Sequence, residues 1–294
     1  MRIENAPEQF RTPHSALRIP VASHSALRAS AGFTMIEIAI CLAIIGFALV
    51  AILGVLPLGM HTQRDVREET IIAQDATVLL EAIRGAARGA DNLTNSVFAI
   101  TNYITQYDNK GNVVGLNPHV AGYTYTAASY DSTPNNYYSL TNGANIIGLL
   151  STPQFTDGTK PIASLIFNGG YSNHVTAYVR AISGLAAEKP PQDNSIMVGD
   201  TFTYHVYCVN AAVAADTNIF NLPQNNPTYI YNHQLAGNLH ELRLTFLWPQ
   251  LPNGNLPANP SRQTFRVSVA GQLAPDQNNN ALYFYQPQSF TTAP

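Results

Sequence analysis

The chain has 294 residues, of which 46 % are hydrophobic and only 11 % are charged, against roughly 25 % charged residues in an average soluble protein. This length suffices for one good-sized domain, or for a domain with an appendage, around a packed core. The net charge of −3 and the scarcity of Lys and Arg after residue 90 exclude the basic surface of a nucleic-acid-binding protein, so we expect no nucleic-acid partner.

Residues 1–32 form a polar segment that carries four arginines against two glutamates. Three prolines in this segment argue against a stable helix. Residues 38–60, in contrast, contain no charged side chain, and this run exceeds the roughly 20 residues that a membrane-spanning helix needs. The arginine-rich segment would stay in the cytoplasm by the positive-inside rule, which places the chain after the helix outside the cytoplasm.

An ordinary secretory signal fits the N-terminal region poorly. The apolar part of such a signal has about 7–15 residues and is followed by a small-residue cleavage site. Here the small residues Ala29–Gly32 precede the apolar run. We therefore expect a cut that removes residues 1–32 and leaves the hydrophobic helix on the mature chain.

Glu37 is the one charged residue near the start of this helix. A carboxylate costs about 2.5–3.5 kcal/mol at the centre of a membrane helix and less near the interface. A free amine generated at Phe33 would lie one helical turn away from Glu37, since residues four apart share a face. The amine of a neighbouring chain could pair with Glu37 instead, and either pairing would offset the cost of burial.

Residues 32–37, which read Gly-Phe-Thr-Met-Ile-Glu, resemble the type IV prepilin processing motif, and residues 43–46 resemble the next part of pilin helices. The resemblance implies that a prepilin peptidase cuts between Gly32 and Phe33 and methylates the Phe33 amine. It also implies that Glu37 neutralises the N-terminus of a neighbouring subunit during assembly. The implied partners are the peptidase, other pilin-like subunits and the inner membrane. The motif does not separate type IV pilins from type II secretion or competence pseudopilins.

The apolar run is expected to continue as one helix from Phe33 to about Arg88. Gly54, Pro57 and Gly59 should bend or loosen it, and Gly89 should stop it.

Beyond His61 the helix becomes amphipathic, with charged residues, Asp75 among them, between apolar residues at helical spacing. The apolar face predicted to pack on a domain consists of Val66, Ile72, Ala76, Leu79, Leu80, Ile83 and Ala87.

The rest of the chain indicates a β-rich domain. Residues 91–160 should form a large irregular insertion with one or two hairpins and a turn at residues 109–112. Strands are then predicted at Ala163–Phe167, Val175–Ile182, Thr201–Val209, Leu239–Trp248, Phe265–Val269 and Leu282–Tyr285. The fold class is therefore α+β: a long N-terminal helix, with a transmembrane half and an amphipathic half, packed on an antiparallel β-sheet domain with long loops.

These elements divide the chain into a cleaved leader (1–32), a transmembrane and assembly helix (33–60), an amphipathic helix (61–90) and a β-rich globular domain (91–294). Residues 238–249, 251–254 and 262–266 resemble the C-terminal part of pilin-like proteins called Verru_Chthon cassette proteins. That resemblance implies a pilin-like component of a larger surface or secretion system.

Residues of the types that form catalytic or metal sites are scattered along the sequence and form no known motif. The Gly-x-Ser-x-Gly, P-loop and dinucleotide motifs do not occur, so we expect no enzyme, no cofactor and no metal. An Asn/Asp-rich loop could still hold calcium, as in some pseudopilins, although none has the EF-hand spacing. His240 is expected to be a hydrogen-bonded core or edge histidine. Cys41 and Cys208 are expected to be small buried apolar side chains that do not pair.

The sequence thus predicts a prepilin-like structural subunit, a minor component of a type IV pilus or type II secretion-like filament. It would cross the inner membrane once, with its N-terminus in the cytoplasm and its domain in the periplasm or in an extracellular filament. The alternatives are an anchored adhesin or binding domain that does not polymerise, an ordinary signal-anchor helix whose motif arose by chance, and an anchored periplasmic enzyme.

Overall fold

The computed structural model describes residues 32–86, 91–114, 121–126, 140, 142–157, 161–162, 169–183, 202–213, 222–276 and 279–292. The chain divides into two compact units, Met1–Gly59 and Met60–Pro294. Almost all of the predicted leader, the predicted strand Ala163–Phe167 and the predicted helix stop at Gly89 lie outside the described residues.

Helix α1 runs from Met35 to Arg84 without interruption, through Pro57. The helix is thus not broken at residues 54–59, although Pro57 has no N–H group to donate. The expected bend in this region stays a prediction. The helix ends four residues earlier than expected. Gly85 N donates to Glu81 O at 2.8 Å, and Ala86 then takes a positive φ of 52°, which turns the chain away from the helical path.

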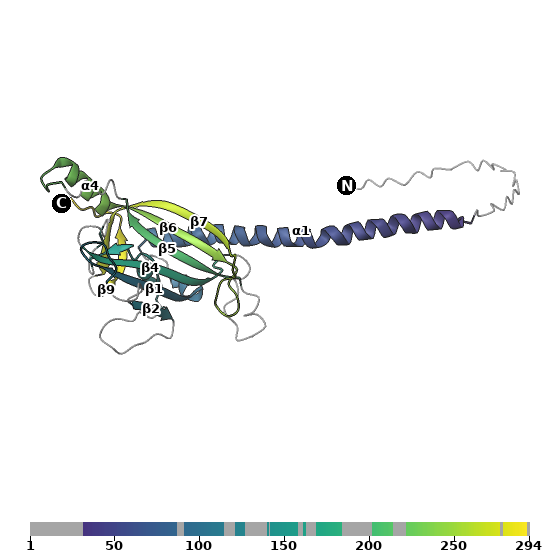
Figure 1. The fold of residues 1–294 in the computed structure, drawn as a ribbon, viewed down its shortest axis with the longest axis horizontal. Helices are drawn as coiled ribbons and strands as arrows, with labels where there is room; N and C mark the ends of the chain where they lie inside the picture. The colour runs from purple at the N-terminus through teal and green to yellow at the C-terminus, as the bar shows by residue number, and fades with distance from the viewer. Residues whose placement is uncertain are drawn as a thin grey trace, which may run out of the picture. The chain divides into compact units, whose positions relative to one another are not determined.

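Within the described residues, an antiparallel sheet of seven strands forms the centre of the domain, with β2 and β7 at the two ends of its main path (Figure 1). Its main path runs β2–β1–β4–β5–β6–β7, and the short β3 pairs with β4. The strands are β1 Val97–Tyr107, β2 Ala121–Thr126, β3 Phe155–Thr156, β4 Gly170–Arg180, β5 Thr203–Ala212, β6 Leu239–Trp248 and β7 Ser261–Ala270. A separate hairpin joins β8 (Gln272–Asp276) to β9 (Asn279–Gln286).

The predicted strands agree best with the structure in the C-terminal part. Strand β6 has the predicted bounds, and its residues alternate between half-buried and buried along the whole strand. The other predicted strands that fall on described residues overlap β4, β5, β7 and β9.

The expectation of an irregular insertion over residues 91–160 is partly wrong. That region holds the eleven-residue strand β1 and the buried helix α2 (Gly143–Leu150), besides the 3₁₀ helix η1 (Asp91–Asn95). The expected hairpin is confirmed by the pairing of β1 with β2. The expected turn is confirmed as well, because the Asp108 carboxylate accepts from Lys110 N and Asn112 N at 2.8 Å and Gly111 has a φ of +80°.

Two helices in the domain begin with an asparagine cap. The side chain of Asn142 accepts from Ala144 N at the start of α2, and that of Asn226 accepts from Thr228 N at the start of α4 (Pro227–Asn238). Such caps satisfy backbone N–H groups that the helix itself cannot pair.

The core lies between the amphipathic half of α1 and one face of the sheet. Ile72, Ala76, Leu79 and Ile83 of α1 share a single buried cluster with residues of β1, β4, β5 and β6. Tyr204, Phe246 and their aromatic neighbours cross the sheet within this cluster, with ring centroids 5.5 to 5.8 Å apart. The protein is therefore an α+β protein, as predicted, with a long N-terminal helix on an antiparallel sheet. Val66, in contrast, is exposed and does not belong to the core.

Candidate functional site

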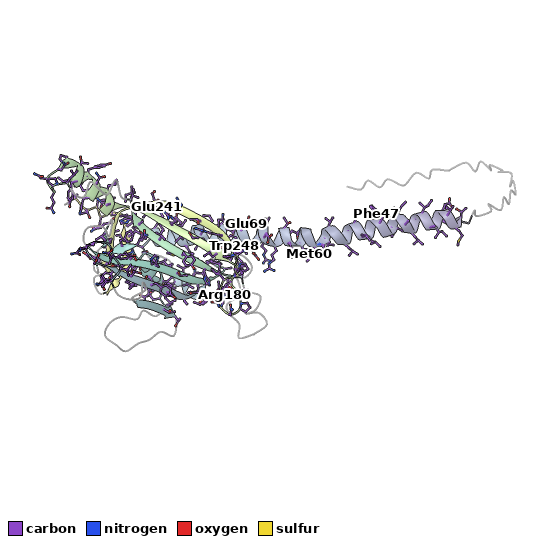
Figure 2. All side chains as sticks on the ribbon, in the orientation of Figure 1. Phe47, Met60, Glu69, Arg180, Glu241 and Trp248 are labelled. Carbon is purple, nitrogen blue, oxygen red and sulfur yellow. The ribbon has the colours of Figure 1, made fainter. Side chains whose placement is uncertain are left out.

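The N-terminal half of α1 is apolar and uncovered. Every described residue from Gly32 to Pro57 is exposed, and the Phe47 side chain, 79 % exposed, projects outward from the helix (Figure 2). Within the described part of the chain, α1 is the one helix long and apolar enough to cross a membrane. Burying such a surface in lipid or against other helices removes it from water, at about 25 cal/mol per Å² of apolar area. This half of α1 therefore has the properties of a single-pass anchor.

The predicted processing residues lie directly before α1. Gly32 and Phe33 precede the first helical residue, Met35, and a Cβ built on Gly32 would meet no atom within 4 Å. Phe33 is exposed. The bond between Gly32 and Phe33 is thus not covered by any described segment of the chain.

Glu37 and Thr34 cap the start of α1 reciprocally. Thr34 N and Thr34 Oγ1 both donate to Glu37 Oε2 at 2.8 Å, and Glu37 N donates to Thr34 Oγ1 at 3.3 Å. This arrangement is a capping box, which pairs two backbone N–H groups that would otherwise lack a partner. The sequence contains its signal, Thr-x-x-Glu, but the prediction assigned Glu37 only to an amine.

The capping box leaves Glu37 able to bind an amine as well. All of its hydrogen bonds to described residues use Oε2, so Oε1 can still accept from a cation. Thr34 would also remain in the chain after a cut between Gly32 and Phe33. The cap and an ammonium partner for Glu37 are therefore compatible.

Asp75, which the sequence pattern placed among the charged surface residues of the helix, is fully buried in the domain. Its Oδ2 accepts from the Tyr204 hydroxyl at 2.7 Å and from Ile182 N at 2.9 Å, and its Oδ1 accepts from Ser183 N at 2.7 Å. Burial, followed by the Asp75 carboxylate, raises the pKa of Tyr204 well above its ordinary value, so this hydroxyl keeps its proton and donates it. The contact fixes α1 to β5 and to the end of β4.

A second buried polar group joins α2, β5 and β9. Tyr285 Oη donates to Asn210 Oδ1 at 2.6 Å, and Asn210 Nδ2 donates to Ser151 O at 2.7 Å. The His240 ring packs edge-on against Tyr285, with 5.7 Å between ring centroids. His240 is a core residue, as expected. Neither ring nitrogen meets the geometry of a hydrogen bond with a described residue, although the Gly237 backbone is near enough to favour the charged ring.

We expect the stability of the domain to depend on His240 at acidic pH. Burial lowers the pKa of His240 to about 4 from 6.5, while the Gly237 backbone acts weakly in the opposite direction. Below pH 6.5 the unfolded chain binds a proton at His240, whereas the folded chain does not. The stability that comes from burying the neutral ring is therefore present above about pH 6.5 and is lost as the pH falls towards 4. Between pH 7 and pH 4 the loss should be about 3 kcal/mol.

Urea unfolding of the full chain in detergent at several pH values measures this loss. In His240→Leu, the free energy of unfolding should fall by about 3 kcal/mol less between pH 7 and pH 4 than in the wild-type chain, because leucine cannot take up a proton. Equal slopes for the two proteins would show that His240 does not stay neutral in the folded domain.

Both cysteines are free, and their surroundings differ. Burial raises the pKa of Cys208 to about 12, which keeps its thiol protonated and unreactive. Cys41 is exposed on the apolar half of α1, so the expectation of a buried side chain is wrong for the single chain. Across the described ranges no three His, Cys, Asp or Glu side chains come close enough together to hold a metal ion.

Comparison of the chain with models of protein families, with curated proteins and with solved structures found no match.

Proposed function

We propose that this chain is a prepilin-like structural subunit, a minor component of a type IV pilus or type II secretion-like filament. A prepilin peptidase would cut it after Gly32, and the mature chain would begin with N-methylated Phe33. Its helix would hold it in the inner membrane, with the domain in the periplasm, until it enters a filament.

The observation that carries this proposal is the position of the Gly-Phe-Thr-Met-Ile-Glu sequence relative to α1. The glycine lies two residues before the Thr34 cap, and the glutamate lies in the first turn of a helix that is apolar and exposed. An ordinary signal anchor requires only the apolar helix. The accessible Gly32–Phe33 bond supports cleavage by a peptidase. The Glu37 carboxylate, which has one unused oxygen, supports the later assembly with other subunits.

The exposed half of α1 supports the assembly step. A helix that is hydrophobic on all sides is stable only when all sides are buried away from water. Lipid would bury them first, and neighbouring helices would bury them after assembly. The carboxylate of Glu37 among such helices would cost several kcal/mol unless a cation neutralised it. The new amine of an adjacent subunit has the required charge.

The first test is mass spectrometry of the mature N-terminus after expression with and without a prepilin peptidase. We expect a peptide that starts at N-methylated Phe33 only when the peptidase is present. The Gly32→Val variant serves as the control, because a branched side chain beside the cut should obstruct the peptidase and leave the leader in place.

A chain that keeps its leader in the presence of an active peptidase would contradict the proposal. So would a cut beyond Met60, which would release the domain from the anchor. Either result would favour the alternative, a membrane-anchored or secreted binding domain.

A further inference from the structure

Strand β7 ends the sheet with an open edge. Its ten residues pair with β6 in continuous register from Ser261 to Ala270, with no bulge. No backbone hydrogen bond joins its other side to any segment that the structure describes. The strand contains no proline, and its two charged residues, Arg262 and Arg266, lie on the face away from the core. Figure 1 shows β7 at the rim of the sheet.

The described residues cover the core only partly under this edge. Phe265 and Val267 point to the core face of the sheet but are only half-buried, unlike their buried partners Leu244 and Leu242 on β6. Gln263 lies on the same face, and its buried Oε1 has no hydrogen-bond partner among the described side chains and backbone groups. An additional strand with apolar residues, and a hydroxyl near Gln263, would cover all three side chains.

The opposite face of the edge is basic. The chain after Lys189 has only three cationic side chains, and all three lie together on β6 and β7: Arg243, Arg262 and Arg266. Arg243 pairs with Glu241, with Nη2 to Oε1 at 2.7 Å. Arg262 and Arg266, four residues apart on β7, are exposed and form no salt bridge within the described ranges. The pKa of Glu241 is lowered mainly by its hydrogen bond with Arg243 and also by the nearby charge of Arg266. Arg266 also lies directly opposite Arg243, an arrangement of like charges that destabilises a sheet.

We propose that β7 binds an extended segment of another protein as an eighth strand, and that this segment carries acidic side chains four residues apart. The open row of backbone groups selects an extended polypeptide. Because side chains alternate across a strand, the two acidic residues would face Arg262 and Arg266. The two core-facing residues between them would lie opposite Gln263 and Phe265, and the core-facing residue beyond the Arg266 partner would lie opposite Val267. A second copy of β7 fits poorly, because it would bring further arginines to the same face. The inference does not depend on the processing of the leader.

The test uses the full chain in detergent micelles and a synthetic peptide, Val-Glu-Val-Thr-Thr-Glu-Thr-amide, labelled with fluorescein at its N-terminus. Paired antiparallel with β7, its two valines lie opposite Val267 and Phe265, and its fifth residue, a threonine, lies opposite Gln263. Binding is measured by fluorescence anisotropy. We expect the Arg262→Glu, Arg266→Glu double variant to bind this peptide about tenfold or more weakly, and to bind the matched peptide with lysine in place of glutamate more tightly than the wild-type chain does. Unchanged urea unfolding of the double variant shows that its fold is intact.

Strand addition is separated from simple charge attraction by N-methylation. Two further peptides are methylated at the backbone nitrogens of alternate residues, one at odd positions and one at even positions. Only one set of nitrogens faces β7, so one peptide should lose binding and the other should keep it. Equal binding of both methylated peptides, equal binding to the wild-type chain and the double variant, or no binding of the acidic peptide would each overturn the proposal.

Discussion

Replacing Asp75 with alanine should lower the free energy of unfolding of the domain by about 3–5 kcal/mol. The substitution leaves three donors, the buried Tyr204 hydroxyl and the part-buried Ile182 N and Ser183 N, without their acceptor. It also removes one of the contacts that join α1 to the sheet. Urea unfolding of the full chain in detergent measures the loss, with the fluorescence of Trp248 as reporter. Trp248 is the one tryptophan in the sequence and is 3 % exposed.

Two variants serve as controls for Asp75→Ala. Glu69→Ala removes an exposed carboxylate from the same helix and should change the stability by no more than about 0.5 kcal/mol. Tyr204→Phe removes one of the three donors together with its hydrogen bond and should cost about 1–2 kcal/mol. If Asp75→Ala were as mild as Glu69→Ala, the buried carboxylate would not hold the helix to the sheet.

Replacing Glu37 with glutamine should abolish assembly into filaments while membrane insertion stays normal. A capping box accepts glutamine in place of glutamate, so this variant keeps the start of α1 and loses only the charge. The amine of a neighbouring subunit would then enter the packed helices without a counter-charge, at a cost of several kcal/mol per subunit. The measurement compares the filament fraction sheared from cells that supply the peptidase and the assembly machinery with the membrane fraction of the same cells.

The matched control for Glu37→Gln is Thr34→Ala. This variant keeps the carboxylate and loses the hydroxyl of the cap, at a cost of about 1 kcal/mol to the helix start, and it should still assemble. The opposite pattern, with Glu37→Gln assembling normally and Thr34→Ala failing, would show that Glu37 acts only as a cap. Normal assembly of both variants would favour a membrane anchor that does not use this carboxylate.

The parts of the fold that the sequence predicted well are those with one face in the core and one face in water. Strand β6 alternates between the two environments at every residue, so its bounds were predicted correctly. The apolar stripe of α1 at Ile72, Ala76, Leu79 and Ile83 was found for the same reason. In such elements the local pattern of polarity follows directly from the geometry of the helix or strand.

Elements without this contrast were missed. Six of the eight residues of α2 are buried, so its sequence shows no polar face at helical spacing. Helix α4 contains two buried residues, Asn232 and Ala236, and has no apolar stripe. A signal for α4 was nevertheless present, since Asn226 followed by Pro227 is a cap followed by a favoured first helical residue.

The buried site at Asp75 could not be predicted from the sequence. The helical pattern placed this residue among the polar positions of the helix, and its partners lie 107, 108 and 129 residues further along the chain. The capping role of Glu37, in contrast, depends on a residue three positions away and could have been predicted. The difference lies in the distance along the sequence over which each contact forms.

That long separation also has a consequence for the newly made chain. Residues 71–83 of α1 leave the ribosome well before β5, since Tyr204 lies 129 residues after Asp75 in the sequence. At about 5–20 residues per second, roughly 6 to 26 seconds of synthesis pass before Tyr204 has been made. In the proposed topology, the apolar half of α1 would therefore insert into the membrane early, whereas the amphipathic half would remain unpacked until the sheet had followed it across the membrane.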